Sequence, residues 1–415
     1  KYSTTTQLSK NVELIEAMTP MGVFEYKLPP SKSHMIRELM LASKSKNETE
    51  IIFDGAPGED IISMSNCLQL MGVEIIMNDG NWLVKPPKDG LTAPKVNIDC
   101  GNSGTVAKIM SVLAATFDSE ITIDGDSSLR KRSNIELAEV LREMGCEVSG
   151  NSFPCIIKGP LKVQKKIEVD VSKTSQPITA LILSSSEFGE RMNVKLLGEE
   201  VSKGYLQLTI NLAKKWGFKG ELRNNSIELI NWNVKSPGSV KIPCEISLYP
   251  MAILLDRLHP NLQVKVDTDD PNNLLVSTLE KLEKKPSRGY ERPEQGILNL
   301  VNASDIITPA AALMAISAGG KIVGAAHSKG KESDRIIKTC ELLNAFSMNC
   351  ESTKDGIILI GNNIPKKPKK PIKTHMDHRL AMTAVILGTS CGAEIDDIEI
   401  IKVTHPEFMD MIKRL

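Results

Sequence analysis

The sequence lacks an excess of either charge and any long apolar run. Lysine plus arginine and aspartate plus glutamate number 51 each, so any cationic function must be local rather than a global attraction to nucleic acid or an anionic membrane. No stretch approaches the roughly 20 apolar residues that span a bilayer, and residues 1–18 lack the apolar core of a signal peptide. We therefore expect a cytoplasmic protein without nucleic-acid or membrane partners.

The sequence also lacks paired cysteine motifs. Its eight cysteines form no CxxC pair and show no zinc spacing with the six histidines. A chain of 415 residues is far larger than a disulfide scaffold, so we expect reduced, mostly buried thiols and no structural metal. The length favours two domains of about 200 residues.

A pattern of a helix followed by two short strands recurs along the chain. Its copies cover 68–87, 141–160, 212–230 and 343–361, with Gly72, Gly145 and Gly217 at the helix ends and Ser347 in the fourth copy. The glycines lie 73 and 72 residues apart, which suits βαβαββ modules better than a solenoid. A weaker copy is expected around 279–285. The alternative is that the helix-then-hairpin pattern recurs by chance.

Modules of this kind in two lobes favour a ligand between the lobes. We expect the chain to cross between them near 27–30 and again near 243–249. The predicted first lobe is 30–243, and the second is discontinuous, with residues 1–29 and 244–415.

The segment PPSKSHMIR, 29–37, predicts an anion site at a helix N-terminus. Pro30 favours extended geometry before it, and Ser31 or Ser33 can cap the apolar helix that follows. The exposed N–H groups of such a terminus favour phosphate or carboxylate, and Lys32 and Arg37 add positive charge. A capped helix with two solvated cations is the simpler alternative.

Three further segments also pass from a strand or loop towards a helix. DCGNSGTVAKIM, 99–110, offers backbone N–H groups and small polar side chains to a ligand. In GDSSLRKRSN, 125–134, an extended chain would place Arg130 and Arg132 on the same side. VDVSKTSQPITALIL, 169–183, places hydroxyls and an amide before an apolar helix. Ordinary turns, caps and solvated arginines are the alternatives.

Two later segments are denser in charge. In GKESDRIIKTCELL, 330–343, a helix from about Glu332 would place Glu332 and Arg335 one turn apart, as a site or as a surface ion pair. In MDHRLAMTAVILG, 376–388, three ionisable residues precede a strongly apolar helix. Together the segments carry more cations than one phosphate requires, which favours two anions or one ligand with phosphate and carboxylate.

These motifs, taken together, resemble those of the enolpyruvyl transferases. The match is carried in order by SKSxxxR at 31–37, GNSGT at 101–105, SLRKR at 128–132, SQ at 175–176, VSKGY at 201–205, KESDR at 331–335 and DHRLAM at 377–382. The resemblance implies a two-lobed α/β fold, an inside-out α/β barrel with about three βαβαββ modules in each lobe and a ligand cleft between them. It is strongest for the branch that transfers the enolpyruvyl group of phosphoenolpyruvate to the 5-hydroxyl of shikimate 3-phosphate.

The resemblance also assigns ligand roles to individual residues. Phosphoenolpyruvate would be bound by Lys32, Gly104, Arg132, Gln176, Arg335 and Arg379. Shikimate 3-phosphate would be bound by Lys32, Ser33, Arg37, Thr174, Ser175, Gln176, Ser202, Tyr205, Asp305, His327 and Lys331. No metal or organic cofactor is implied, and we expect a monomer.

The catalytic positions of the family fall on Asp305, Glu332, Lys32 and His378. Asp305 would take the proton of the attacking hydroxyl, and Lys32 or Glu332 would protonate the enol carbon. The cations around the site would stabilise the departing phosphate when the lobes close.

Several positions depart from the family pattern. Val403 stands where the family has a lysine, and Lys402 beside it would face the opposite side if the segment were a strand. The other departures are His327 for an asparagine, Lys108 and Ile109 for an Arg-Pro pair, Ser133 for a proline, and the segment 243–250. They leave two alternatives open: a transferase for another acceptor, such as a nucleotide or amino sugar, and a non-catalytic ligand-binding relative.

Overall fold

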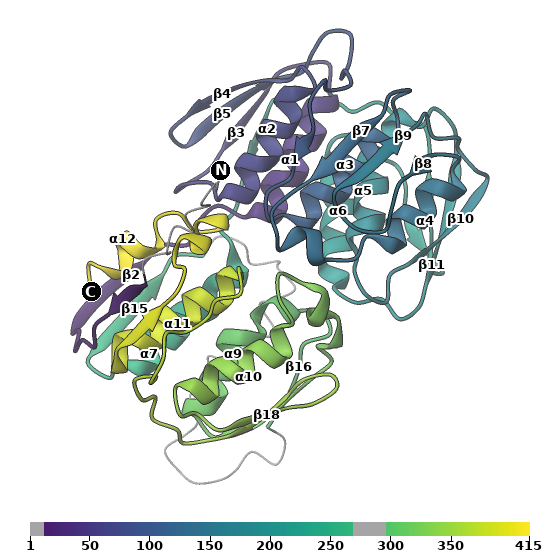
Figure 1. Cartoon of the computed structure of the whole chain (residues 1–415). Coiled ribbons are helices and arrows are strands. Elements are labelled where there is room, and N and C mark those ends of the chain that lie inside the picture. Colours follow the sequence, from purple (N-terminus) through teal and green to yellow (C-terminus); the bar gives the residue numbers. More distant parts are fainter. Residues whose placement is uncertain (1–11, 269–295) are drawn as a thin grey trace, which may run out of the picture.

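Two lobes, each with its own hydrophobic core, make up the molecule (Figure 1). The computed structural model describes residues 12–268 and 296–415. One core draws its buried side chains from Met35 to Ile242, and the other from Ile15 to Leu28 and from Ile246 to Ile412. On this basis we propose the lobe boundaries 30–243 for the first lobe, and 1–29 with 244–415 for the second.

Three four-stranded sheets with one common topology build the first lobe. Their strand orders are β14-β3-β5-β4, β6-β7-β9-β8 and β10-β11-β13-β12, and in each the first pair is parallel and the other two are antiparallel. The strands are β3 (Thr49–Ile52), β4 (Glu74–Asn78), β5 (Asn81–Lys85), β6 (Ile98–Asp99), β7 (Ile121–Asp124), β8 (Glu147–Val148), β9 (Cys155–Lys158), β10 (Lys166–Asp170), β11 (Met192–Leu197), β12 (Leu222–Arg223), β13 (Ser226–Leu229) and β14 (Ser239–Lys241).

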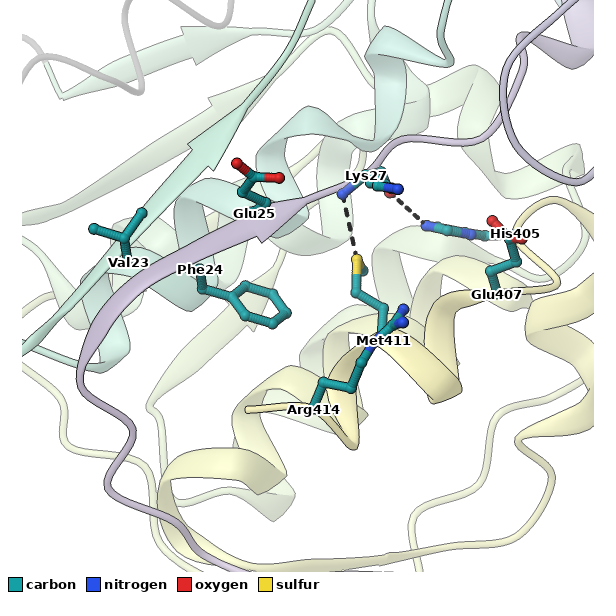
Figure 2. Close-up of a pocket in the computed structure, with 8 residues that line it drawn as sticks. All are labelled: Val23, Phe24, Glu25, Lys27, His405, Glu407, Met411 and Arg414. Carbon is teal, nitrogen blue, oxygen red and sulfur yellow. Dashed lines mark hydrogen bonds between the residues drawn. The ribbon is translucent and has the colours of Figure 1, made fainter.

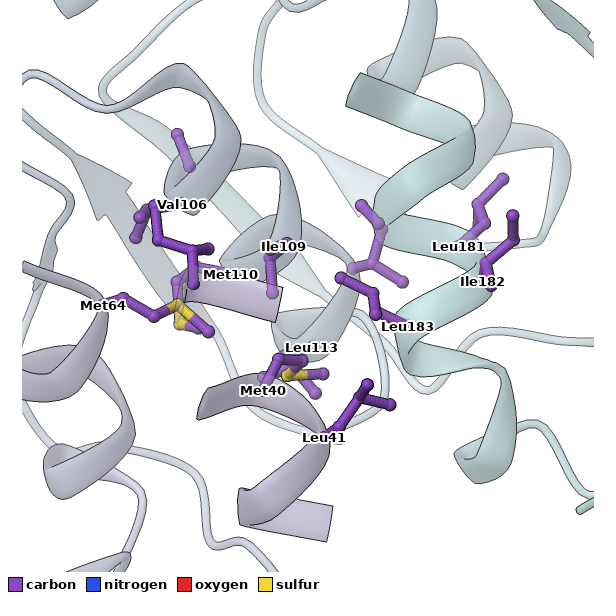
Figure 3. Packing of buried hydrophobic residues seen from close by; sticks show 14 of the residues in the cluster. Met40, Leu41, Met64, Val106, Ile109, Met110, Leu113, Leu181, Ile182 and Leu183 are labelled. Atoms are coloured by element: carbon purple, nitrogen blue, oxygen red, sulfur yellow. The ribbon is translucent and has the colours of Figure 1, made fainter. Parts of the chain in front are cut away.

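Helices fill the interior of this lobe. They are α1 (Lys32–Lys44), α2 (Glu59–Leu70), α3 (Gly104–Ala114), α4 (Ile135–Glu143), α5 (Gln176–Ser184) and α6 (Lys203–Lys215). The sequences of α3 and α5 have almost no polar face, and nearly all their residues are buried. Figure 3 shows Met40 and Leu41 of α1 beside Leu113 of α3 and Leu183 of α5. This packing holds the N-termini of the three helices in fixed positions.

The predicted helix-then-hairpin repeat is confirmed at all four places. Helices α2, α4 and α6 end before Gly72, Gly145 and Gly217, whose φ angles are 101°, 86° and 108°. Glycine adopts such positive φ angles without steric strain because it has no Cβ. Ser347 adopts the same conformation with φ 61° despite its side chain. The weaker copy expected around 279–285 lies outside the described residues.

The second lobe contains a complete module of the same kind and two smaller sheets. The complete module has strand order β16-β17-β19-β18, and β15-β2 and β1-β20 are two-stranded. The helices and strands of the second lobe are β1 (Glu13–Ile15), β2 (Gly22–Tyr26), α7 (Tyr249–Leu258), β15 (Leu262–Val266), β16 (Ile297–Asn299), α9 (Ile307–Ile316), β17 (Gly319–Val323), α10 (Arg335–Ala345), β18 (Cys350–Ser352), β19 (Ile357–Ile360), α11 (His378–Cys391), β20 (Ala393–Ile395) and α12 (Phe408–Ile412). No helix within 12–268 or 296–415 has the length and apolarity that crossing a membrane requires.

The two segments that connect the lobes lie side by side. The amide of Ser31 donates to the carbonyl of Pro243 at 2.8 Å, and the amide of Glu245 donates to the carbonyl of Pro29 at 2.8 Å. The PPSKS motif therefore begins at the paired connection between the lobes.

Two local predictions are wrong. The segment around Val403 is not a strand but the 3-10 helix η6 (Glu399–Val403), in which Val403 is buried and the exposed Lys402 pairs with Glu399. Helix α10 begins at Arg335 rather than near Glu332, because Asp334 caps it by accepting from the amide of Ile337.

Candidate active site

Three helices of the first lobe carry predicted site residues at their N-termini. The side chain of Ser31 accepts from the amide of His34 and starts α1, so that Lys32 lies at its first position. Ser103 caps α3 in the same way. A Cβ atom on Gly104 would lie 3.2 Å from Oε1 of Gln176, which begins α5, and 3.4 Å from Nη1 of Arg132. The structure thus brings Gly104, Gln176 and Arg132 together.

The second lobe contacts this region directly. The hydroxyl of Tyr205 in α6 donates to Oδ2 of Asp305 at 2.6 Å, across the two lobes. Ser128 Oγ donates to the carbonyl of Glu332 at 3.1 Å, and the amide of Ser202 donates to the carbonyl of Val301 at 3.1 Å. The lobes are therefore closed on each other around the predicted site residues.

Arg335 is the centre of the charged groups in the second lobe. Its Nε donates to Asp377 at 2.9 Å, Nη1 donates to Asp305 at 2.9 Å, and Nη2 donates to Glu332 at 2.7 Å. The side chain is 1% exposed, and three carboxylates raise its pKa despite the burial. Arg335 thus fixes the positions of Asp305 and Glu332 relative to each other.

Asp305 is held as a carboxylate. Burial by itself raises the pKa of a carboxyl group. The cations Lys331, Arg379 and Arg335 outweigh the burial and, with the hydrogen bond from Tyr205, hold the pKa of this group well below its usual range. Lys331 Nζ lies 4.0 Å from Oδ1 of Asp305.

Lys32 is held as a cation. Burial lowers its pKa, but Asp60, Glu332 and Glu245 outweigh burial and raise it. Its Nζ donates to Oδ2 of Asp60 at 3.1 Å, and its amide donates to Oε1 of Glu245 at 3.3 Å. The pKa of Glu332 is held well below its usual range because, against its burial, Arg335 and the nearby cations favour the ionised form.

Two buried arginine N–H groups, one from each lobe, have no acceptor among the described residues. Arg132 Nη2 donates to Asn102 and Ser128, but its Nε has no partner. Arg379 donates twice to Ser247, and its Nε also has no partner. Buried donors of this kind normally have an acceptor, so both are candidate donors to a ligand.

Arg37, one of the residues predicted to bind a second ligand, is buried between α1 and α6. Its Nε donates to Thr209 at 2.8 Å, its guanidinium lies 5.9 Å from the centre of the Tyr205 ring, and burial lowers its pKa to about 10. Ser33 is bound to Arg37 only through its carbonyl, which accepts at 2.9 Å. Ser202, whose carbonyl accepts from the amide of Tyr205 at 3.0 Å, has φ 54°.

The segment before α5 carries two more predicted residues. Thr174 Oγ1 accepts from the amide of Gln176 at 3.1 Å, and Ser175 is the buried N-cap residue of the helix. Gln176 also donates to Thr105 at 3.3 Å, which orients its amide. Among the described residues, no hydrogen bond joins Thr174 or Ser175 to the opposite lobe.

Both predicted histidines are held neutral. Burial, with Lys32 and the nearby arginines, lowers the pKa of His378 far below its ordinary value, and neither ring nitrogen has a partner in the described structure. His327, in the 3-10 helix η5 (Ala326–Gly330), has its pKa lowered to about 4 by burial and Lys331. A neutral imidazole can accept a hydrogen bond and a proton.

Arg130 lies outside the site. The segment Leu129–Lys131 is the 3-10 helix η1 rather than an extended chain, so the expected common side for the two arginines is wrong. Arg130 is exposed and pairs with Asp124 at 2.7 Å, whereas Arg132 turns inward.

Several residues of this site were assigned no role from the sequence. Asp377 holds Arg335 and also caps α11 by accepting from the amide of Arg379. Asp60 pairs with Lys32, and Glu245 bonds to the start of α1. The sequence places Asp377 among three ionisable residues before a strongly apolar helix but does not show its partner, whereas Asp60 looks like any acid in a first helical turn.

The described residues contain no cluster of histidine, cysteine, aspartate and glutamate that could hold a metal ion. A cavity of about 230 Å³ lies elsewhere, between β2 and α12, and is lined by Phe24, Lys27 and Met411 among others (Figure 2). There the backbone of Lys27 is hydrogen-bonded to Met411 and His405, and none of the residues that line this cavity belongs to the charged site.

Comparison with known proteins gives one family for the sequence. The model of the EPSP synthase (3-phosphoshikimate 1-carboxyvinyltransferase) family matches residues 24–250 and 264–412. The chain belongs to the EPSP synthase family. This confirms the resemblance to the enolpyruvyl transferases.

Relatives of similar length support the assignment. The 3-phosphoshikimate 1-carboxyvinyltransferase of Thermococcus kodakarensis is 28% identical over 412 residues, which cover 94% of this chain and 97% of the relative. The protein of the same name from Mycobacterium ulcerans is 28% identical over 417 residues, covering 92% of each chain.

Solved structures confirm the predicted fold. EPSP synthase from Acinetobacter baumannii matches with a TM-score of 0.73 and 21% identity over 97% of both chains. The enolpyruvyl transferase NikO from Streptomyces tendae matches with a TM-score of 0.71 and 9% identity over 97% of both chains. At these identities the likeness concerns the fold alone.

Proposed function

We propose that this chain transfers the enolpyruvyl group of phosphoenolpyruvate to the 5-hydroxyl of shikimate 3-phosphate and releases phosphate. The observation that carries the proposal is the pair of buried, unpartnered Nε–H groups of Arg132 and Arg379, from opposite lobes. An anion with a phosphate at one end and a carboxylate at the other could satisfy both. The names of the relatives support this substrate pair.

Phosphoenolpyruvate would lie between these two arginines. Gly104 leaves space beside Gln176 and Arg132, and Lys32 adds a third cation. Arg335 is already paired with three carboxylates. It would therefore hold these carboxylates in position and also contribute positive charge to the phosphoenolpyruvate site. The proposed ligands remain Lys32, Gly104, Arg132, Gln176, Arg335 and Arg379.

Shikimate 3-phosphate would lie on the side of Arg37 and Tyr205. Hydroxyl groups and amides there suit a polyhydroxylated ring, and Arg37 and Lys331 suit its charges. The proposed ligands remain Lys32, Ser33, Arg37, Thr174, Ser175, Gln176, Ser202, Tyr205, Asp305, His327 and Lys331.

Asp305 is the proposed base. It is ionised, so it can accept the proton of the 5-hydroxyl as that oxygen bonds to C2 of phosphoenolpyruvate. A carboxylate with so low a pKa is a weak base, but two bound anions nearby would raise its pKa. Tyr205 and Arg335 hold its two oxygens in place.

Lys32 is the proposed proton donor to C3. Its raised pKa keeps it protonated, whereas Glu332 is ionised and has no proton to give. The tetrahedral intermediate would then break its C2–O bond to phosphate and lose a proton from C3, which yields the enolpyruvyl ether. Neutral His378 and ionised Glu332 are the proposed acceptors for that proton.

A transferase for another acceptor is the second candidate. It is favoured by His327, which lies among the proposed acceptor ligands, since its neutral ring offers one donor and one acceptor rather than an amide. We propose a cytoplasmic monomer in either case.

An assay of phosphate release separates the candidates. The protein is incubated with phosphoenolpyruvate and, in separate reactions, shikimate 3-phosphate, a nucleotide and an amino sugar. We expect release with shikimate 3-phosphate alone. Release with another acceptor and none with shikimate 3-phosphate would favour the second candidate, and no release with any acceptor would favour a non-catalytic relative.

A further inference from the structure

A basic groove lies on the second lobe, outside the proposed active site. One wall is a face of α10 formed by Lys338, Leu342 and Ala345, whose spacing places them on one side of the helix. The other wall is the chain segment 366–373 with His375. The space between them has a volume of about 750 Å³, which is within the range of small-molecule sites.

The second wall has a regular sequence. In PKKPKKP a proline recurs at 365, 368 and 371, with pairs of lysines between. Three residues make one turn of a polyproline II helix, so this spacing favours prolines on one edge and lysines on the other two. Pro368 is buried, whereas the four lysines between the prolines are exposed.

Backbone hydrogen bonds anchor this segment at both ends. The amide of Lys366 donates to the carbonyl of Phe346 at 2.9 Å, and the amide of Ile372 donates to the carbonyl of Glu394 at 2.7 Å. The proline rings restrict the chain between these points. The lysines therefore project from a backbone that is already ordered, which reduces the conformational entropy lost when a ligand binds.

The charge of the groove is strongly one-sided although the chain as a whole is neutral. The acidic residue of its walls is Glu341, which is already paired with Lys338 at 3.0 Å and lies 3.9 Å from His375. The lysines of the walls are Lys338, Lys366, Lys367, Lys369, Lys370 and Lys373.

We propose that this groove binds a small molecule that carries two or three linked phosphates. Lysine ammonium groups bind phosphate oxygens as point charges, and several linked phosphates can contact several lysines at once. The buried apolar side chains of Leu342 and Ile372 line the same space and suit an organic portion of the ligand. This binding site goes beyond the proposed enolpyruvyl transfer.

Each wall of the groove is continuous in the chain with residues of the proposed active site. Helix α10 begins with Arg335, one turn before Lys338. His375 lies two residues before Asp377, which holds the guanidinium of Arg335. His375 and Met376 have φ angles of 52° and 56°, which are strained for residues with side chains.

The test is calorimetric titration of the whole protein with inorganic tripolyphosphate at low ionic strength, where screening is weak. The variant Lys369→Gln/Lys370→Gln removes two exposed charges of the groove. The matched control is Lys165→Gln/Lys166→Gln, which removes two exposed charges at the start of β10 in the first lobe. All four residues are exposed, so neither variant should disturb folding.

We expect saturable binding whose dissociation constant rises about tenfold in the groove variant and stays within about twofold in the control. Equal affinity of all three proteins would overturn the proposal, because binding would then lie elsewhere. Tighter binding of a peptide of glutamates than of tripolyphosphate would also overturn it, in favour of an acidic protein partner. Neither result depends on catalytic activity.

Discussion

Arg335 and Asp377 form an ion pair at 2.9 Å in which neither side chain is more than 1% exposed. The pair joins the start of α10 to the start of α11, and the same guanidinium holds Asp305 and Glu332. Because a buried charge without its partner is costly, the pair fixes the geometry of both proposed acid-base residues.

The first prediction concerns this pair. Asp377→Asn keeps the shape and a cap acceptor but removes the charge, so the buried guanidinium should shift towards Asp305 and Glu332. We expect kcat/KM to fall roughly 100-fold, which corresponds to about 2.7 kcal/mol. Steady-state kinetics measure it. The matched control is Asp334→Asn at the start of α10, which touches none of these groups and should change kcat/KM less than about threefold. Equal losses in both variants would contradict the account.

The second prediction concerns the contact between the lobes. Tyr205→Phe removes the hydroxyl that donates to Asp305, and a hydrogen bond to a charged group contributes about 1.5–3 kcal/mol. We expect the KM for shikimate 3-phosphate to rise roughly tenfold. Tyr26→Phe is the control, because the Tyr26 hydroxyl is buried without a partner in the described structure and its removal should not alter kinetics. A wild-type KM in Tyr205→Phe would refute the role of this contact.

The third prediction concerns space at the start of α3. A methyl group on Gly104 would lie 3.2 Å from Gln176, which must then move, and 3.4 Å from Arg132, in contact with its guanidinium. Overpacking of this kind costs about 1–3 kcal/mol, and we expect the KM for phosphoenolpyruvate to rise roughly tenfold. Gly150→Ala is the matched control, since its Cβ would meet nothing within 4 Å. An unchanged KM in Gly104→Ala would place phosphoenolpyruvate elsewhere.

The fourth prediction concerns pH and stability. Burial raises the pKa of Glu38 to about 7, although Trp216 donates to it at 2.6 Å. Between its unfolded pKa, about 4.3, and about 7 the folded state binds more protons, so this group lowers stability as the pH rises through that range. Glu38→Gln should remove the loss and raise the free energy of unfolding at pH 8 by about 1–3 kcal/mol, with no gain at pH 4.

Urea unfolding of both proteins at several pH values measures this difference. A difference between the two proteins that does not change with pH would show that Glu38 is ionised at its ordinary pKa in the folded protein. The measurement is made on the first-lobe transition, because Glu38 and Trp216 are both buried in that lobe.

The elements that could be predicted from sequence are those with local physical causes. Ser31 caps α1 because the residues around it specify an extended chain and then an apolar helix. Gly72, Gly145 and Gly217 end helices because the turn requires a positive φ. These local causes were enough to find the module repeat.

Other features depend on tertiary contacts and could not be predicted. The two arginines of the SLRKR motif bind different partners, Arg130 at Asp124 and Arg132 at Asn102, because the chain between them is a 3-10 turn. The role of Asp60 appears only when α2 is packed beside α1, which brings its carboxylate to Lys32. Val403 is buried in the core of the second lobe from η6, and the backbone there approaches Gly58 so closely that an added Cβ would lie 2.5 Å from the carbonyl of Val403.

The most direct measurement is turnover of phosphoenolpyruvate with shikimate 3-phosphate by the wild type and Asp305→Ala, following phosphate release and the mass of the product. We expect the wild type to release one phosphate for each enolpyruvyl product, and Asp305→Ala to bind shikimate 3-phosphate but to release no phosphate. Wild-type turnover by Asp305→Ala would contradict its role as base, and no enolpyruvyl product from the wild type would contradict the proposed function.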